Sequence, residues 1–307
     1  MYETYRSPYL SPHTVSSLAR AIATFAPPTL RPVRRRLVSA RGRAVRLLDR
    51  LSERDIAILR DLDRLRLLTG KQLRRLHFAD GDPITQARKA RAVMRRLDDL
   101  GVIVRLERRV GGMRAGSEGF VIGLSGWGFA VLDVVHDRQR RHRRVIETKP
   151  AFQSHILAVS ELYIDLVEHS RQSGDELLEF AGEPDAWRRF GGLGGEAITL
   201  KPDAFVRLGT GDVEVLAFIE QDLATESLPT LARKLAVYVS YWRSGQEQRS
   251  HGVFPRVWWL VPTTSRAEAI RRVVAGLARE AQALFAVCLA REATASLTHL
   301  PAAGGAV

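Results

Sequence analysis

The sequence has a single cysteine, Cys288, so the chain cannot form a disulfide within itself. Cys288 lies in the apolar run 284–290, where we expect a small buried side chain rather than a nucleophile. A chain without disulfides is typical of a reducing compartment, which favours a location inside the cell.

The N-terminal residues lack the pattern of a secretory signal, in which a positively charged segment precedes an apolar one. A long apolar segment is also missing, because the uncharged stretch 121–132 is too short and too rich in glycine to span a bilayer. We therefore expect a cytoplasmic protein that makes no contact with a membrane.

Acidic residues are scarce in the first half of the chain. Residues 1–150 contain 32 Lys and Arg against 15 Asp and Glu, a net charge of +17, whereas residues 151–307 contain 15 against 19, a net charge of −4. This asymmetry predicts that the first half binds a polyanion. Most of the excess is arginine, which forms bidentate contacts with phosphate and guanine. We expect double-stranded DNA as the partner, and a solvated basic surface is the alternative.

Residues 1–50 are rich in Pro, Ser and Arg, with few apolar side chains to build a core. This composition predicts a flexible basic arm, at least up to about Ala40. Two interpretations of the arm remain open: it follows the DNA backbone or a groove, or it is a disordered leader.

Residues 51–135 carry the pattern of a winged helix-turn-helix domain. Capping residues mark three helix starts, at Ser52, Thr69 and Asp82. Two short apolar strands around a basic, glycine-rich loop follow, and then a further helix, which is the element order of that fold. The charged residues 136–150 are expected to form a basic linker.

The third predicted helix, from Pro83 to Leu100, has the composition of a DNA recognition helix. One face carries an apolar stripe and the opposite face carries arginines. We expect this helix to lie in the major groove and the basic loop to contact the DNA backbone or minor groove, whereas an arginine-coated surface helix is the alternative. The predicted DNA-binding residues are Arg88, Lys89, Arg91, Arg95 and Arg96 on the helix and Arg105, Arg108, Arg109 and Arg114 on the wing.

Residues 151–300 predict an α/β domain with a mixed central sheet. A helix is expected at 152–170, and the continuous apolar run 257–261 indicates a central strand that is buried on both faces. The predicted element order is α-β-β-β-α-β-α-β. The remaining elements are strands at 177–180, 200–208, 213–221 and about 285–290, a helix that begins after Ser227 and a helix that begins with a capping box at 265–268.

Three acidic residues lie where two of these strands meet. Lys201-Pro202-Asp203-Ala204 is interpreted as a strand that ends in a turn, and the next apolar strand ends on Glu220 and Asp222. Because strand side chains alternate between faces, Glu220 and Asp222 should point the same way. This is the layout of metal-dependent nucleases with a Pro-Asp…(Asp/Glu)-x-Lys signature, except that Asp222 stands where the lysine is expected.

Two further residues belong to the predicted site. Lys234, on the next helix, could replace the missing lysine, and Glu161, on the first helix, stands where a third acid often joins. If the site is active, Asp203, Glu220 and Asp222 would hold Mg²⁺ or Mn²⁺. If it is not, we expect no cofactor.

Three interpretations of these acids remain open. The first is an active nuclease in which Lys234 supplies the positive charge. The second is a nuclease core that has lost its activity and serves as a scaffold or protein-contact domain. The third is a different fold with ordinary surface carboxylates. A carboxylate beside Glu220 adds repulsion rather than transition-state stabilisation, so the non-catalytic interpretation is favoured.

Several short segments of the sequence are specific as a set: Leu51-Ser52-Glu53-Arg54-Asp55, the run from Gly119 to Gly128, Lys201-Pro202-Asp203-Ala204, the run from Glu220 to Glu226, and Lys234 with Tyr238. In these segments the chain resembles the replication-relaxation family of actinobacterial plasmids and integrated conjugative elements. The resemblance covers about residues 51–289, and the Glu-x-Asp form of the acids looks typical of the family.

The resemblance implies an α+β / α/β protein, with an N-terminal winged helix-turn-helix followed by a restriction-endonuclease-like α/β domain that has a degenerate site. It also implies a DNA-binding protein of a mobile element that acts in plasmid replication initiation, relaxation or mobilisation. A relaxase or another replication or transfer protein would be its partner, and a homodimer is an open alternative. A Mg²⁺-dependent DNA nuclease or nickase is the alternative function, and a transcriptional repressor is the second.

Overall fold

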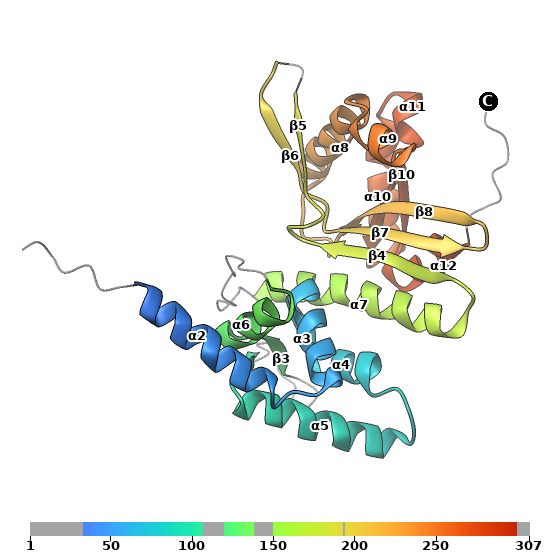
Figure 1. Ribbon diagram of the computed structural model, residues 1–307. Helices are drawn as coiled ribbons and strands as arrows, with labels where there is room; N and C mark the ends of the chain where they lie inside the picture. The colour runs from blue at the N-terminus through green and yellow to red at the C-terminus, as the bar shows by residue number, and fades with distance from the viewer. Residues whose placement is uncertain (1–32, 107–119, 138–149, 193, 300–307) are drawn as a thin grey trace, which may run out of the picture. The chain divides into compact units, whose positions relative to one another are not determined.

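The computed structural model describes residues 33–106, 120–137, 150–192 and 194–299 (Figure 1). The chain divides into two units between Arg43 and Ala44, and every described element except the start of helix α2 lies in the second unit. Helix α2 (Val33–Leu48) occupies part of the segment that was predicted to be a flexible arm. The difference has a local cause, because the residues after Pro32 are mostly Arg, Leu, Val and Ala, and no proline interrupts them.

The helices predicted after Ser52, Thr69 and Asp82 are confirmed. Each of these three residues accepts a hydrogen bond from a backbone N–H in the first turn of its helix. The sequence did not predict the short strand β1, which pairs with β3 in a three-stranded antiparallel sheet of order β1-β3-β2. The elements are α3 (Glu53–Leu65), β1 (Leu67–Thr69), α4 (Gly70–His77), α5 (Pro83–Asp99), β2 (Ile103–Leu106), β3 (Val121–Leu124) and α6 (Gly126–Val135).

A mixed five-stranded sheet forms the second half of the described chain, as predicted. Its order is β10-β9-β8-β7-β4, with antiparallel pairing on the β4 side and parallel pairing on the β10 side. A separate hairpin is made of β5 (Arg188–Gly191) and β6 (Ala197–Leu200). The sheet strands are β4 (Glu176–Gly182), β7 (Ala204–Thr210), β8 (Val213–Gln221), β9 (Arg256–Val261) and β10 (Phe285–Leu289).

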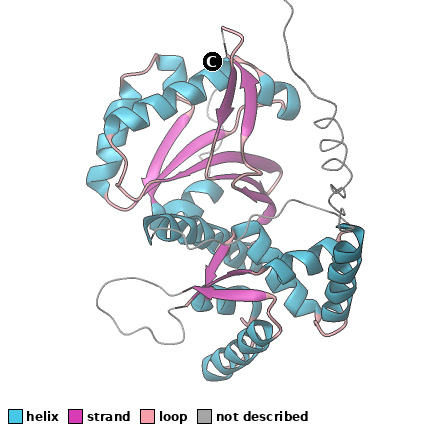
Figure 2. Ribbon diagram, turned by 90° about the vertical axis from the view of Figure 1, so that its left-hand side faces the viewer, coloured by secondary structure: helices cyan, strands magenta, loops and turns pink. Residues whose placement is uncertain are grey.

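Helices cover both faces of this sheet (Figures 1 and 2). Side chains of α7 pack in one apolar cluster with Val206, Ala217 and Ile219 of the sheet. On the opposite face, side chains of α8 and α10 pack with Phe205 and Phe218. The helices are α7 (Pro150–Gln172), α8 (Leu228–Arg243), α9 (Gln246–His251), α10 (Thr264–Ala275), α11 (Arg279–Gln282) and α12 (Ala293–Thr298).

Two predicted element boundaries were wrong. The strand predicted at 200–208 is divided, because β6 ends at Leu200 and β7 begins at Ala204. Pro202 lies in the break and has no N–H to donate to a strand ladder. Helix α10 is capped by Thr263 rather than by Ser265, since the Thr263 side chain accepts from the N–H of Arg266.

One apolar core joins the segment from α3 to α6 to the five-stranded sheet. Ile58 and Leu73 belong to the same buried cluster as Leu162 of α7 and Ile219 of β8. Cys288 is a buried free thiol in this cluster, as predicted. Among the described residues, no helix combines the length and the apolar character needed to cross a bilayer.

Candidate functional site

The carboxylates of Asp203, Glu220 and Asp222 lie at one end of the antiparallel pair β7–β8. Asp203 precedes β7, and its N–H donates to the carbonyl of Ile219 at 3.0 Å. Glu220 lies near the end of β8, and Asp222 follows that strand. The three residues are at most 8% exposed. The contacts of Glu220 and Asp222 come from α8 and α10, which cover the same face of the sheet, so the predicted common orientation of these two side chains is confirmed.

Glu220 is held by two side chains of α8. Lys234 Nζ donates to Oε2 at 2.9 Å, and the hydroxyl of Tyr238 donates to Oε1 at 2.7 Å. Burial, followed by the negative charge of Asp203, raises the pKa of Glu220 to about 7. Burial lowers the pKa of Lys234, but the charges of Glu220 and Asp203 outweigh this and hold that pKa above its usual value. The structure therefore brings Lys234 to Glu220, as the sequence predicted.

Asp222 is paired with an arginine that the sequence did not point to. The Nε and Nη2 atoms of Arg266 both donate to Oδ2 of Asp222, at 3.0 and 2.7 Å. The N–H of Ala224 donates to Oδ1, and Arg266 also donates to the carbonyl of Glu226 at 2.7 Å. Asp222 stands at the position where a catalytic lysine is expected. Through Arg266 it connects the start of α10 to residues 222–226, which follow β8.

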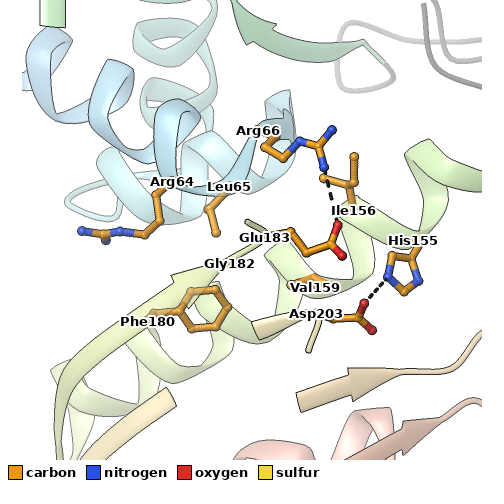
Figure 3. Close-up of a pocket in the computed structure, with 10 residues that line it drawn as sticks. All are labelled: Arg64, Leu65, Arg66, His155, Ile156, Val159, Phe180, Gly182, Glu183 and Asp203. Atoms are coloured by element: carbon orange, nitrogen blue, oxygen red, sulfur yellow. Dashed lines mark ion pairs between the residues drawn. The ribbon is translucent and has the colours of Figure 1, made fainter. Parts of the chain in front are cut away.

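Asp203 faces His155 of α7 (Figure 3). Nε2 of His155 lies 3.0 Å from Oδ1 of Asp203, and this hydrogen bond raises the pKa of the imidazole. Both side chains line a small crevice, about 30 Å³ in volume, together with Arg66 and Glu183, which form an ion pair at 3.7 Å. The remaining carboxylate oxygen of Asp203 accepts from the N–H of Gln221 at 2.7 Å.

The oxygens of the three carboxylates are already bound by protein groups. Each of the six accepts a hydrogen bond or ion pair, and Lys234 and Arg266 supply cations, so a divalent metal would have to compete with these partners. Mg²⁺ and Mn²⁺ bind through such oxygens. In the part of the chain that the structure describes, no three His, Cys, Asp or Glu residues are grouped to hold a metal ion.

Glu161 does not join these acids, contrary to the prediction. It lies on the face of α7 that contacts α4, where it accepts from Gln72 Nε2 at 2.7 Å and pairs with Arg75. Arg75 also pairs with Asp165 and Glu168, which follow on the same face of α7. Glu161, which was predicted as a candidate catalytic acid, therefore helps to hold α4 against α7.

Four cationic side chains on α5 are exposed and bind no acidic group among the described residues. These are Arg88, Lys89, Arg91 and Arg95; Arg91 Nε donates to the carbonyl of Ala87 at 3.2 Å. Buried beneath the helix are Ala90, Met94 and Leu97, so the predicted separation into an apolar and a basic face is confirmed.

The other predicted DNA-binding residues differ from these four. Arg96 donates to both oxygens of Asp55 at 2.6 Å, and Asp55 is fully buried. Burial raises the pKa of Asp55, but the bonds from Arg96 and Ser52 outweigh it and hold that pKa below its usual value. Arg105 pairs with Asp98 at 3.0 Å. Arg108, Arg109 and Arg114 lie outside the described residues.

A family model described as replication-relaxation matches residues 59–257, which include α5 and the three carboxylates. The match begins within α3 and ends at the start of β9, so it includes the sheet strands β4, β7 and β8. No curated protein and no solved structure matches the chain.

Proposed function

The chain belongs to the replication-relaxation family, and from this premise we propose that it binds double-stranded DNA of a plasmid or another mobile element. There it would act in replication initiation, relaxation or mobilisation. The observation that carries the proposal is the basic face of α5, where Arg88, Arg91 and Arg95 are exposed without an acidic partner among the described residues. Unpaired guanidinium groups on one face of a helix match phosphate oxygens and the guanine edge in the major groove.

The loop between β2 and β3 would serve as the wing, with Arg108, Arg109 and Arg114 contacting the backbone or minor groove. Arg96 and Arg105 would contribute less to binding than predicted, because each already pairs with an acid of its own domain. DNA contact by Arg96 would have to compete with the buried charge of Asp55.

We assign the sheet region a role in assembly or in positioning DNA, not in catalysis. The paired oxygens of Asp203, Glu220 and Asp222 support this assignment, because catalytic metal sites keep open ligand positions. A relaxase or another replication or transfer protein is the proposed partner of this region.

The link between the two regions supports a rigid arrangement. Arg75 of α4 binds three acids of α7, and Arg171 of α7 donates to the carbonyl of Leu76 at 2.8 Å. The regions also share one apolar core. A sheet region held in this way would occupy a fixed place along the duplex that α5 binds.

Duplex binding tests the proposal directly. A binding site selected from a random pool of duplexes by the full chain would be labelled and titrated by fluorescence anisotropy. Arg88→Ala and Arg95→Ala should each weaken specific binding by about 1–3 kcal/mol if the side chain contacts a guanine. Arg272→Ala, which removes an exposed arginine from α10, is the matched control. Equal affinity of all three variants and the native chain would refute the role of α5.

A Mg²⁺-dependent nuclease or nickase is the second candidate. It is favoured by the 2.9 Å contact between Lys234 and Glu220, which brings together the residue types of a nuclease site. Incubation of supercoiled plasmid with Mg²⁺ or Mn²⁺ tests it, and cleavage that Asp203→Ala abolishes would support it over the non-catalytic role. A transcriptional repressor is the third candidate. It requires binding sites at the promoter of the gene for this protein, and DNA binding that does not need residues 151–307. Those residues share an apolar core with the rest of the described chain, which argues against this candidate.

A further inference from the structure

The most exposed large apolar side chain among the described residues is Ile84, in the first turn of α5. Its exposed fraction is 79%, against 57% for Val213 and 53% for Val253. The turn that carries Ile84 is well fixed. Asp82 accepts from the N–H of Thr85 at 3.0 Å, and Pro83 occupies the first helical position. The exposure of Ile84 therefore belongs to an ordered helix start.

Ile84 lies on the same face as the exposed arginines. The positions of Ile84, Arg88, Arg91 and Arg95 are i, i+4, i+7 and i+11, which fall within an arc of roughly 60° on an α-helix. Ala90, Met94 and Leu97 point elsewhere, into the core. Ile84 thus lies at the N-terminal end of the row of exposed arginines. In helix-turn-helix complexes the N-terminal residues of the recognition helix contact the base edges in the major groove.

We propose that Ile84 contacts the C5-methyl group of a thymine in the duplex that α5 binds, and so determines part of the sequence specificity. This inference rests on the proposed function. In the major groove only thymine presents a methyl group, and apolar side chains recognise it by contact. The three arginines on the same stripe supply the charge that holds this face against a polyanion. Burial of Ile84 against the methyl removes apolar surface of both groups from water.

Uracil interference tests the contact. The duplex selected by the full chain is synthesised with random, partial replacement of thymine by uracil, which removes only the C5-methyl group. Bound and free duplexes are separated and the uracil positions are mapped. With the native chain, uracil at one or two positions of the binding site should reduce binding roughly three- to tenfold.

Three variants identify the residue that makes the contact. Ile84→Ala should abolish uracil sensitivity at those positions and leave the remaining pattern intact; alanine favours helix, so the fold should be kept. Ile84→Asn should shift the preference at one of those positions from thymine to adenine. Val213→Ala, an exposed apolar residue of β8, should keep the native pattern.

The outcomes separate the inference from the proposed function. Binding that depends on Arg88 and Arg95 but shows no uracil sensitivity would overturn the contact by Ile84 and leave DNA binding standing. An Ile84→Ala variant with the native uracil pattern would also overturn it, since another group would then contact the methyl. Failure of the full chain to bind any duplex in the pool would overturn both.

Discussion

The basic face of α5 and the carboxylate cluster at the end of β8 differ in the exposure and pairing of their charged groups. On α5, Arg88, Lys89 and Arg95 are exposed, and the structure gives them no acidic partner among the described residues. At the cluster, each carboxylate is buried and each of its oxygens is bound. An exposed charge without a partner is available to a ligand, whereas a buried charge that is fully paired serves the fold. The comparison supports the proposed role of α5 in recognition and a structural role for the cluster.

The largest expected effect concerns Arg266. Arg266→Met removes both donors to Oδ2 of Asp222 and leaves a buried carboxylate without its cation, which should lower the free energy of unfolding by about 3–5 kcal/mol. Urea denaturation measures the change. Arg272→Met, on the same helix but exposed, should change it by less than about 0.5 kcal/mol. If the two variants lose equal free energy of unfolding, the pairing of Asp222 with Arg266 does not stabilise the fold, and the structural role of the cluster is contradicted.

The next effect is a pH dependence of stability. The folded state keeps the proton on Glu220 up to a pKa of about 7, whereas an unfolded glutamate releases it near 4.5. The folded state therefore binds more protons between these values, and the free energy of unfolding should fall as the pH rises through them, by up to about 3 kcal/mol. His155 acts in the same direction: its stabilising contribution is complete below pH 6.5 and is lost as the pH rises through its raised pKa.

Glu220→Gln should flatten this dependence, because the amide does not titrate. Its single carbonyl oxygen can still accept from Lys234 or from Tyr238, which bind different oxygens of the native carboxylate. Urea midpoints measured at several pH values between 4.5 and 8 give the two curves. Parallel curves for the native chain and the variant would show that another group causes the pH dependence.

Arg96 and Arg88 of α5 allow a paired arginine to be compared, on one helix, with one that has no acidic partner among the described residues. Arg96→Met leaves the buried Asp55 without its cation and should destabilise the chain by about 1–3 kcal/mol. Arg88→Met, on the exposed face of α5, should change stability by less than about 0.5 kcal/mol. Thermal unfolding compares them, and a larger loss for Arg88→Met than for Arg96→Met would reverse the assigned roles.

Short-range sequence patterns correctly predicted the starts of helices α3, α4 and α5. The caps at Ser52, Thr69 and Asp82 act within three residues of themselves, so the sequence pattern contains both partners. The apolar stripe of α5 depends only on helical spacing, which also made its basic face predictable. Strand β1 was missed because its three residues form a strand only by pairing with β3.

Two partners of the carboxylates, Arg266 and His155, could not be predicted, because they are distant in the sequence. Arg266 lies 44 residues after Asp222, and His155 lies 48 residues before Asp203. Glu161 was assigned to the wrong site for the same reason, since its partner Arg75 comes from α4. Lys234 was placed correctly because the helix that follows β8 returns over the end of that strand.

The salt dependence of duplex binding tests the central claim most directly. Affinity for the selected duplex is measured at several salt concentrations for the native chain and for the double variant Arg88→Ala/Arg95→Ala. If α5 contacts DNA through these two side chains, the slope of log affinity against log salt should become shallower by about 2, roughly 0.9 for each lost phosphate contact, or the specific affinity should fall with the loss of guanine contacts. An unchanged slope together with an unchanged affinity would contradict the account.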